Sequence, residues 1–375
     1  MKRSFFVILL IFILFFCGCE NDINTLTDEN TVKIVFAVQR DNTGIFREIT
    51  ESFVSDHKNI NVKLIELPEE TNECYRVLSS ILAGNEIVVD IFAAEDIWLK
   101  NFIELGYVEP IKNVEVKSSE YPEHISDVIY ENGKLYAVPL HLDCGILFYR
   151  KDLVDQCPNY RQIADSSMPF SVRTQDGEDT LCILRECVML EGDTAKGLEL
   201  YRKLYDADGA DTDCISEFKS GRTAFLRSWS SKNAVMYNYD EQMQGKIRAD
   251  VMRKGDSIVS TARLYCTAVN SACDESRISA VWEFLKYLNS ESVQLKICKE
   301  TGTLPLKYKY YDSPVICDYN TYNETFAKYL DKLSYRPFDS GYMIRSEAAY
   351  KTLKNYLDNK IGAEEAADAI ESITE

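Results

Sequence analysis

The chain alternates between short apolar runs and longer stretches in which large apolar residues recur at helical spacing. The run VKIVFAV at residues 32–38 is rich in β-branched residues and is typical of a buried strand. Alternation of this kind predicts a parallel sheet covered by helices. In the first part of the chain it predicts strands at residues 32–38, 61–67 and 87–93 and helices at residues 44–57, 72–83 and 96–105.

The rest of the chain is predominantly helical in pattern. Two strand-like runs, residues 134–139 and 145–149, are separated by the segment His141-Leu142-Asp143-Cys144. Amphipathic spacing then predicts helices within residues 180–220 and at residues 280–288, 292–301, 322–333, 347–359 and 363–373.

The N-terminus has the features of an export signal. Lys2 and Arg3 precede an uninterrupted apolar run from Phe5 to Phe16, which is too short to cross about 30 Å of hydrocarbon as a helix. Residues 20–30 are polar, acidic and aperiodic, as in a flexible tether. A cleaved signal and an uncleaved anchor both place the remaining residues outside the cytoplasm.

Length and charge narrow the class of protein. A chain of 375 residues suits two lobes of ordinary size. The formal net charge of −18 argues against nucleic-acid binding and against an electrostatic grip on anionic lipid heads. Composition therefore indicates a soluble, globular body without a nucleic-acid partner.

The twelve cysteines form no C-x-x-C pair, which argues against a zinc knuckle or a thioredoxin-type motif. Export permits disulfides, but spacing cannot assign partners to the ten cysteines that follow Cys17 and Cys19. Cys182 and Cys187 lie in an apolar stretch, where we expect core residues.

No enzyme motif emerges from the sequence. His57, His124 and His141 are not spaced as zinc ligands, and no G-x-S-x-G motif occurs. Residues 192–197 have the two glycines of a phosphate-binding loop but lack the Lys-Ser/Thr that should follow. We therefore predict neither catalytic residues nor a metal or cofactor site.

Four stretches resemble extracellular solute-binding protein family 1, the maltose- and trehalose-binding type. They contain VDIF and GYVEPI (residues 89–111), NGKLYAVP and LFYRKDL (132–153), FKSGRTAF with a following tryptophan (218–229), and residues 336–366. Their order along the chain matches the family. Two places depart from it: Arg263-Leu264 stands where a Gly-Gly pair is common, and the first loop reads Gln39-Arg40.

The resemblance implies an α/β, two-lobed periplasmic-binding-protein-like fold of type II, with three crossing strands and a ligand cleft between the lobes. The crossings are expected near residues 141–144, 259–264 and 306–311. The implied organisation is a signal peptide (1–18), a lipidated cysteine and tether (19–30), lobe 1 (31–141 plus 264–306) and lobe 2 (142–263 plus 307–375). Closure of the lobes would bury the ligand.

A sugar ligand would need aromatic rings against its C–H faces and polar side chains at its hydroxyls. The residues expected in the cleft, carried over from the family by position, are Gln39, Arg40, Glu95, Asp143, Trp229, Arg263, Tyr265 and Arg336. Other roles stay open: Glu95 as a helix cap, Asp143 as an exposed hinge residue, Trp229 as core and Arg336 in a structural ion pair. Trp98 and Trp282 are predicted to be core residues.

The resemblance further implies a monomeric binding lipoprotein that delivers a mono- or oligosaccharide to the permease subunits of an ABC importer. Cys19, preceded by the small residue Gly18, would carry the palmitate-containing lipid anchor to the bacterial cell membrane. A sensor for a membrane receptor and, less plausibly, a glycosidase using Glu95 and Asp143 are the alternatives. Arg263 and the Gln39-Arg40 loop suit a more polar or acidic ligand than a plain disaccharide.

Overall fold

The computed structural model describes residues 31–84, 88–172, 177–207, 213–232, 243, 245–317 and 323–374. The expected signal segment, Cys19 and the tether lie outside these ranges. Among the helices described, none combines the length and the apolar character needed to cross a membrane.

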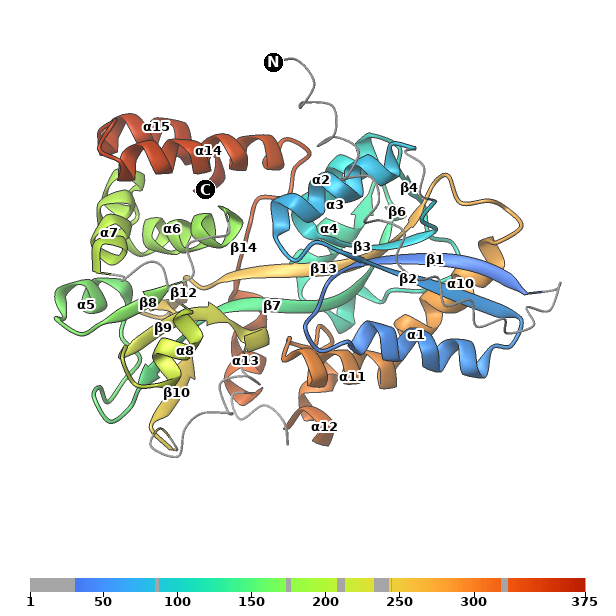
Figure 1. Cartoon of the computed structure of the whole chain (residues 1–375), viewed down its shortest axis with the longest axis horizontal. Helices are drawn as coiled ribbons and strands as arrows, with labels where there is room; N and C mark the ends of the chain where they lie inside the picture. The colour runs from blue at the N-terminus through green and yellow to red at the C-terminus, as the bar shows by residue number, and fades with distance from the viewer. Residues whose placement is uncertain are drawn as a thin grey trace, which may run out of the picture.

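The first lobe is built on parallel strands, as the alternating pattern predicted. The edge strand β2 pairs in parallel with β1 over its whole length, and β1 also pairs in parallel with β3. The connecting helices cover the sheet on the right of Figure 1. The elements are β1 (Val32–Gln39), α1 (Ile45–Asp56), β2 (Ile60–Leu67), α2 (Thr71–Leu82), β3 (Ile91–Glu95), α3 (Asp96–Glu104), β4 (Val108–Glu109), α4 (Glu123–Ile129), β5 (Tyr130–Glu131) and β6 (Lys134–Leu135).

Two long antiparallel strands, β7 (Ala137–Arg150) and β13 (Thr261–Asn270), run from one lobe into the other (Figure 1). β13 pairs with β3 and β4 of the first lobe, whereas β7 pairs with β9 and β10 of the second. One continuous sheet, ordered β2-β1-β3-β13-β7-β9-β8, therefore passes through both lobes. The fold is the mixed α/β, two-lobed architecture that the sequence predicted.

The second lobe packs helices around β7, β8, β9 and β10. Its elements are α5 (Tyr160–Asp165), β8 (Phe170–Val172), α6 (Gly177–Glu191), α7 (Thr194–Ala207), α8 (Cys214–Lys219), β9 (Phe225–Trp229), η2 (Ser230–Lys232), β10 (Ile247–Asp250), β11 (Arg253–Lys254), β12 (Ser257–Ile258), α14 (Tyr342–Leu357) and α15 (Ala363–Thr374). The chain between β13 and α14 forms α10 (Ile278–Leu288), α11 (Glu291–Thr301), η4 (Tyr308–Asp312), α12 (Pro314–Cys317), α13 (Asn323–Tyr329) and β14 (Ser334–Tyr335).

The strand β7 joins two runs that the sequence pattern had separated. Its register with β13 shifts at Pro139, so that Tyr265 faces His141 and Cys266 faces Pro139. Proline has no N–H to donate, and a bulge is one of the few places where a central strand accepts it. The segment expected to be a gap therefore continues the strand.

The third connection differs from the expected crossing strand. Leu304 forms a single antiparallel bridge with Leu142, and residues 308–312 are a 3₁₀ helix. The chain returns to the second lobe through the short strand β14, which pairs with the start of β13. The predicted lobe boundaries at 141/142 and 263/264 fall inside β7 and β13. The division of the chain into two lobes at these residues stays a prediction.

All ten described cysteines are free of disulfides in the structure. Cys182 and Cys187 are buried, as predicted. The pKa of the Cys187 thiol is raised well above its usual range by burial, which keeps this sulfur protonated in the core.

Candidate ligand-binding site

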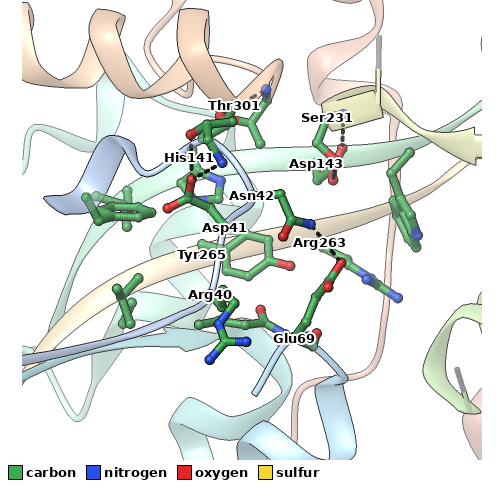
Figure 2. A pocket seen from close by; sticks show the side chains of 18 of the residues that line it. Arg40, Asp41, Asn42, Glu69, His141, Asp143, Ser231, Arg263, Tyr265 and Thr301 are labelled. Atoms are coloured by element: carbon green, nitrogen blue, oxygen red, sulfur yellow. Dashed lines mark hydrogen bonds between the residues drawn. The ribbon is translucent and has the colours of Figure 1, made fainter. Parts of the chain in front are cut away.

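A cavity of about 230 Å³ lies where the two lobes meet the crossing strands. The first lobe contributes the loop after β1, Phe46, Glu69, Ala93 and Trp98, and the second lobe contributes Asp179, Trp229, Ser231 and Lys232. Its floor is formed by β7 and β13, whose paired positions Asp143–Arg263 and His141–Tyr265 present their side chains to it (Figure 2). A ligand in this cavity would touch both lobes.

Tyr265 occupies the middle of the cavity in Figure 2 and is supported from one side by a stack of rings. Its ring lies 4.5 Å from that of His141 at an angle of 28°, and Phe46 lies 6.5 Å beyond His141. Burial lowers the pKa of His141 to about 3, so the imidazole is neutral. The arrangement holds the Tyr265 ring as a rigid apolar surface with a hydroxyl at its end.

Asp143 is committed to the protein's own hydrogen bonds. Its carboxylate accepts from Ser230 Oγ at 2.5 Å, Ser231 Oγ at 2.6 Å, and the backbone nitrogens of Ser231 and Cys144, both at 3.0 Å. Burial raises the pKa of Asp143, and the donors from Ser230 and Ser231 act in the opposite direction. Asp143 therefore fixes the turn at residues 230–232 against β7.

Trp229 lies between two guanidinium groups. The guanidinium carbon of Arg263 is 3.7 Å from the Trp229 ring centroid, and that of Arg227 is 4.3 Å from it. The indole nitrogen donates to Asp179 at 2.9 Å, and Asp179 also accepts from Arg263 Nη2. Trp229 and Asp179 together hold Arg263 in place at the cavity floor.

A glycine provides the space for this arrangement. Gly145 pairs with Trp229 across the sheet, and a Cβ on it would clash with Arg227 Nη2 and would lie 2.6 Å from Glu186 Oε1. Arg227 donates to Glu186 at 2.6 Å in this space, and Tyr160 donates to the same carboxylate at 2.6 Å. The absence of a side chain at residue 145 therefore allows the buried pair that supports Trp229.

Arg336 is the centre of a second buried cluster, which joins the lobes. Its Nη2 donates to Glu95 at 2.6 Å and Asp96 at 2.8 Å, and its Nη1 donates to Glu178 at 3.3 Å. All four side chains are fully buried. Burial raises the pKa of Asp96 to about 6, although nearby Arg336 acts to lower it.

The structure thus brings six of the eight residues expected in the cleft onto the cavity lining: Gln39, Arg40, Asp143, Trp229, Arg263 and Tyr265. Glu95 and Arg336 lie instead in the ion-pair cluster, paired with each other. A Glu95–Asp143 pair of catalytic carboxylates is not available, because Glu95 is fully buried and bound to Arg336.

Other lining residues were not expected from the sequence. Trp98, predicted to be core, is almost fully buried but also borders the cavity, and its indole nitrogen has no hydrogen-bond partner in the part of the chain that the structure describes. Asp179 and Lys232 carry no distinguishing sequence motif. Within the described ranges, no group of three or more His, Cys, Asp or Glu side chains is arranged to hold a metal ion.

Known proteins match both the sequence and the fold. Residues 48–324 match the family described as bacterial extracellular solute-binding protein. The structure superimposes on maltose-bound MalE3 of T. maritima with a TM-score of 0.81 at 19% identity, covering 91% of this chain and 98% of that chain.

Two further solved structures share the fold. The GacH receptor of Streptomyces glaucescens, solved unliganded and with acarbose, gives a TM-score of 0.77 at 19% identity and covers 91% and 96% of the two chains. A solute-binding protein of Agrobacterium radiobacter in complex with ribitol gives 0.77 at 17% identity and covers 92% and 98%. The family match spans most of the chain and these structures share its architecture; the chain belongs to the bacterial extracellular solute-binding proteins, which bind solutes outside the cytoplasm and are not enzymes.

Proposed function

We propose that this chain is the lipid-anchored substrate-binding component of an ABC importer, and that it binds a small carbohydrate in the cavity between its lobes. The observation that carries the proposal is the cavity itself. It combines the supported Tyr265 ring with charged and hydroxyl side chains from both lobes, which matches the faces and edges of a sugar.

The ligands of the three similar structures belong to the same ligand class. These ligands are maltose, acarbose and ribitol, all of which are polyhydroxylated. The cavity of about 230 Å³ is smaller than the roughly 300–1,000 Å³ typical of drug-sized ligands, so we favour a single sugar ring or a short polyol over an oligosaccharide.

The anchor and the lobes complete the proposal. Cys19, after the signal segment, would carry the lipid, and residues 20–30 would tether the body to the membrane. Lobe 1 (31–141 plus 264–306) and lobe 2 (142–263 plus 307–375) would close on the ligand as a monomer and present it to the permease subunits. Labelling with radioactive palmitate tests the anchor: Cys19→Ser should abolish incorporation, and continued labelling would contradict this site.

A thermal-shift screen with a panel of sugars tests the ligand class, because a ligand that binds only the folded state raises the melting temperature. We expect at least one mono- or disaccharide or polyol to stabilise the protein in proportion to the logarithm of its concentration. Stabilisation by an amino acid, amine or peptide but by no carbohydrate would contradict the proposal.

A further inference from the structure

The carboxylates around the cavity are largely occupied by donors from the protein. Asp143 accepts four hydrogen bonds, and Asp179 accepts from Trp229 and Arg263. Asp41, at the N-terminal end of α1, accepts from Thr43 N and Gly44 N, each at 2.8 Å. These groups therefore offer few acceptor sites to a ligand's hydroxyls.

Several N–H donors on the cavity floor, in contrast, have no acceptor among the described residues. Arg263 uses Nη2 for Asp179, whereas its Nε is buried without an acceptor, and its Nη1 has none among the described residues. The indole nitrogen of Trp98 is likewise buried, with no acceptor among the residues that the structure describes. Nη1 is the Arg263 N–H group that is not fully buried, so a ligand gains most by bringing an acceptor to Nη1.

A second cation stands next to this floor. Lys232 is the last residue of the turn fixed by Asp143 and lines the cavity, and its amino group contacts no carboxylate within the described residues. At the mouth, Arg40 and Glu69 are both exposed and carry opposite charges, which solvent largely screens. Asp41, Asp143 and Asp179 line the same cavity but already accept hydrogen bonds from the protein, so the charged donors left to a bound solute are Arg263 and Lys232.

We propose that the solute is an acidic carbohydrate, a single polyhydroxylated ring or chain whose anionic group lies between Arg263 and Lys232. This inference rests on the proposed carbohydrate-binding function and deepens it. An anionic oxygen would accept a charge-assisted hydrogen bond from Arg263 Nη1, and such bonds are roughly twice as strong as neutral ones. The hydroxyl-bearing part would then lie against Tyr265.

Calorimetric titration of matched ligands into the purified protein tests the proposal. Glucuronate and galacturonate carry a carboxylate, glucose and galactose are their neutral counterparts, glucosamine is cationic, and glucose 6-phosphate replaces the carboxylate by a phosphate. We expect at least one acid to bind about tenfold or more tightly than its neutral counterpart, and this preference to shrink as salt rises.

Two variants locate the anionic group. Lys232→Gln, at a partly exposed position, should weaken the acid about three- to tenfold and its neutral counterpart by less, because only the acid loses a charge interaction. The exposed Lys203→Gln on α7 makes the same change in net charge away from the cavity and should alter neither affinity. Arg263→Lys keeps the charge but not the planar fork, and should reduce the preference for the acid further.

The outcomes separate this inference from the function on which it rests. Tighter binding of glucose 6-phosphate than of the sugar carboxylates would support an anionic ligand and identify its anionic group as a phosphate. Binding of a neutral sugar or glucosamine with equal or higher affinity than every acid would overturn the inference and leave carbohydrate binding intact. Binding of a non-carbohydrate alone would overturn both.

Discussion

The guanidinium carbon of Arg263 lies 3.7 Å from the ring centroid of Trp229, so that a cation covers the ring expected to stack on a sugar. Arg227 approaches the same ring at 4.3 Å. The strand register explains both contacts: Arg263 and Arg227 oppose Asp143 and Leu147 on β7, on either side of Gly145, which opposes Trp229. Trp229 therefore positions Arg263, and Tyr265 is left as the ring available to a ligand.

Replacing Trp229 by Phe keeps an aromatic ring between the cations but removes the hydrogen bond to Asp179. We expect a stability loss of about 1–3 kcal/mol and a several-fold loss of ligand affinity, because Arg263 loses its support. Urea unfolding and calorimetry measure the two effects. Trp282→Phe, on α10, should lower stability alone. Unchanged affinity in Trp229→Phe would show that Arg263 is held without the indole.

Gly145→Ala tests the space beneath Trp229. The added Cβ would meet Arg227 and Glu186 at less than van der Waals distance, and both partners are buried. We expect a loss of about 2–4 kcal/mol in the free energy of unfolding. The matched control is Gly362→Ala, where a Cβ meets no atom within 4 Å. Equal stability of the two variants would contradict the packing described here.

Arg336→Met should damage the protein more than any cavity substitution. It leaves Glu95, Asp96 and Glu178 buried without their shared cation, and losing one partner of a buried ion pair costs about 3–5 kcal/mol. Chemical denaturation gives the magnitude. Arg345→Met, which breaks a more exposed pair with Asp339, should cost less than about 1 kcal/mol. A stable Arg336→Met variant with reduced affinity alone would assign Arg336 to the ligand.

The ion-pair cluster also predicts a dependence of stability on pH. Asp96 has a pKa of about 6 in the folded protein and an ordinary value of 3.8, so the folded state binds the additional proton between these values. The contribution of Asp96 to stability is therefore present at low pH and is lost as the pH rises from about 4 to 6.

Asp96→Asn removes this titration and isolates it. The stability of the variant relative to the wild type should increase as the pH rises from 4 to 7, by an amount of order 1–3 kcal/mol, and then level off. Unfolding by urea at a series of pH values measures the difference. The exposed Asp165→Asn gives the baseline. A flat difference for Asp96→Asn would mean that Asp96 is ionised throughout this range.

Much of the fold could be predicted from the sequence because its elements have local signals. The apolar run before residue 39 and the helical spacing after Gly44 lead to β1 and α1 almost to the residue. The pattern failed at β7, where Pro139 suggests an end to the strand. Only pairing with a distant strand, β13, shows that the strand continues past Pro139 through a shift in register.

The candidate site was less predictable because burial and partners are properties of the folded chain. Glu95 and Arg336 are 241 positions apart, and the sequence does not reveal that they pair. Position on the crossing strands did place Asp143, Arg263 and Tyr265 at the cavity. Trp98 was assigned to the core by its helical spacing, which cannot show that one edge of a core residue borders a cavity.

The measurement that tests the central claim most directly is calorimetric titration of the most strongly stabilising carbohydrate into the wild type and into Tyr265→Ala. We expect one binding site in the wild type and an affinity at least about tenfold lower in the variant, because the supported ring is lost. Tyr308→Ala, outside the cavity, should bind like the wild type. No binding of any carbohydrate to the wild type, or equal binding to Tyr265→Ala, would contradict the account.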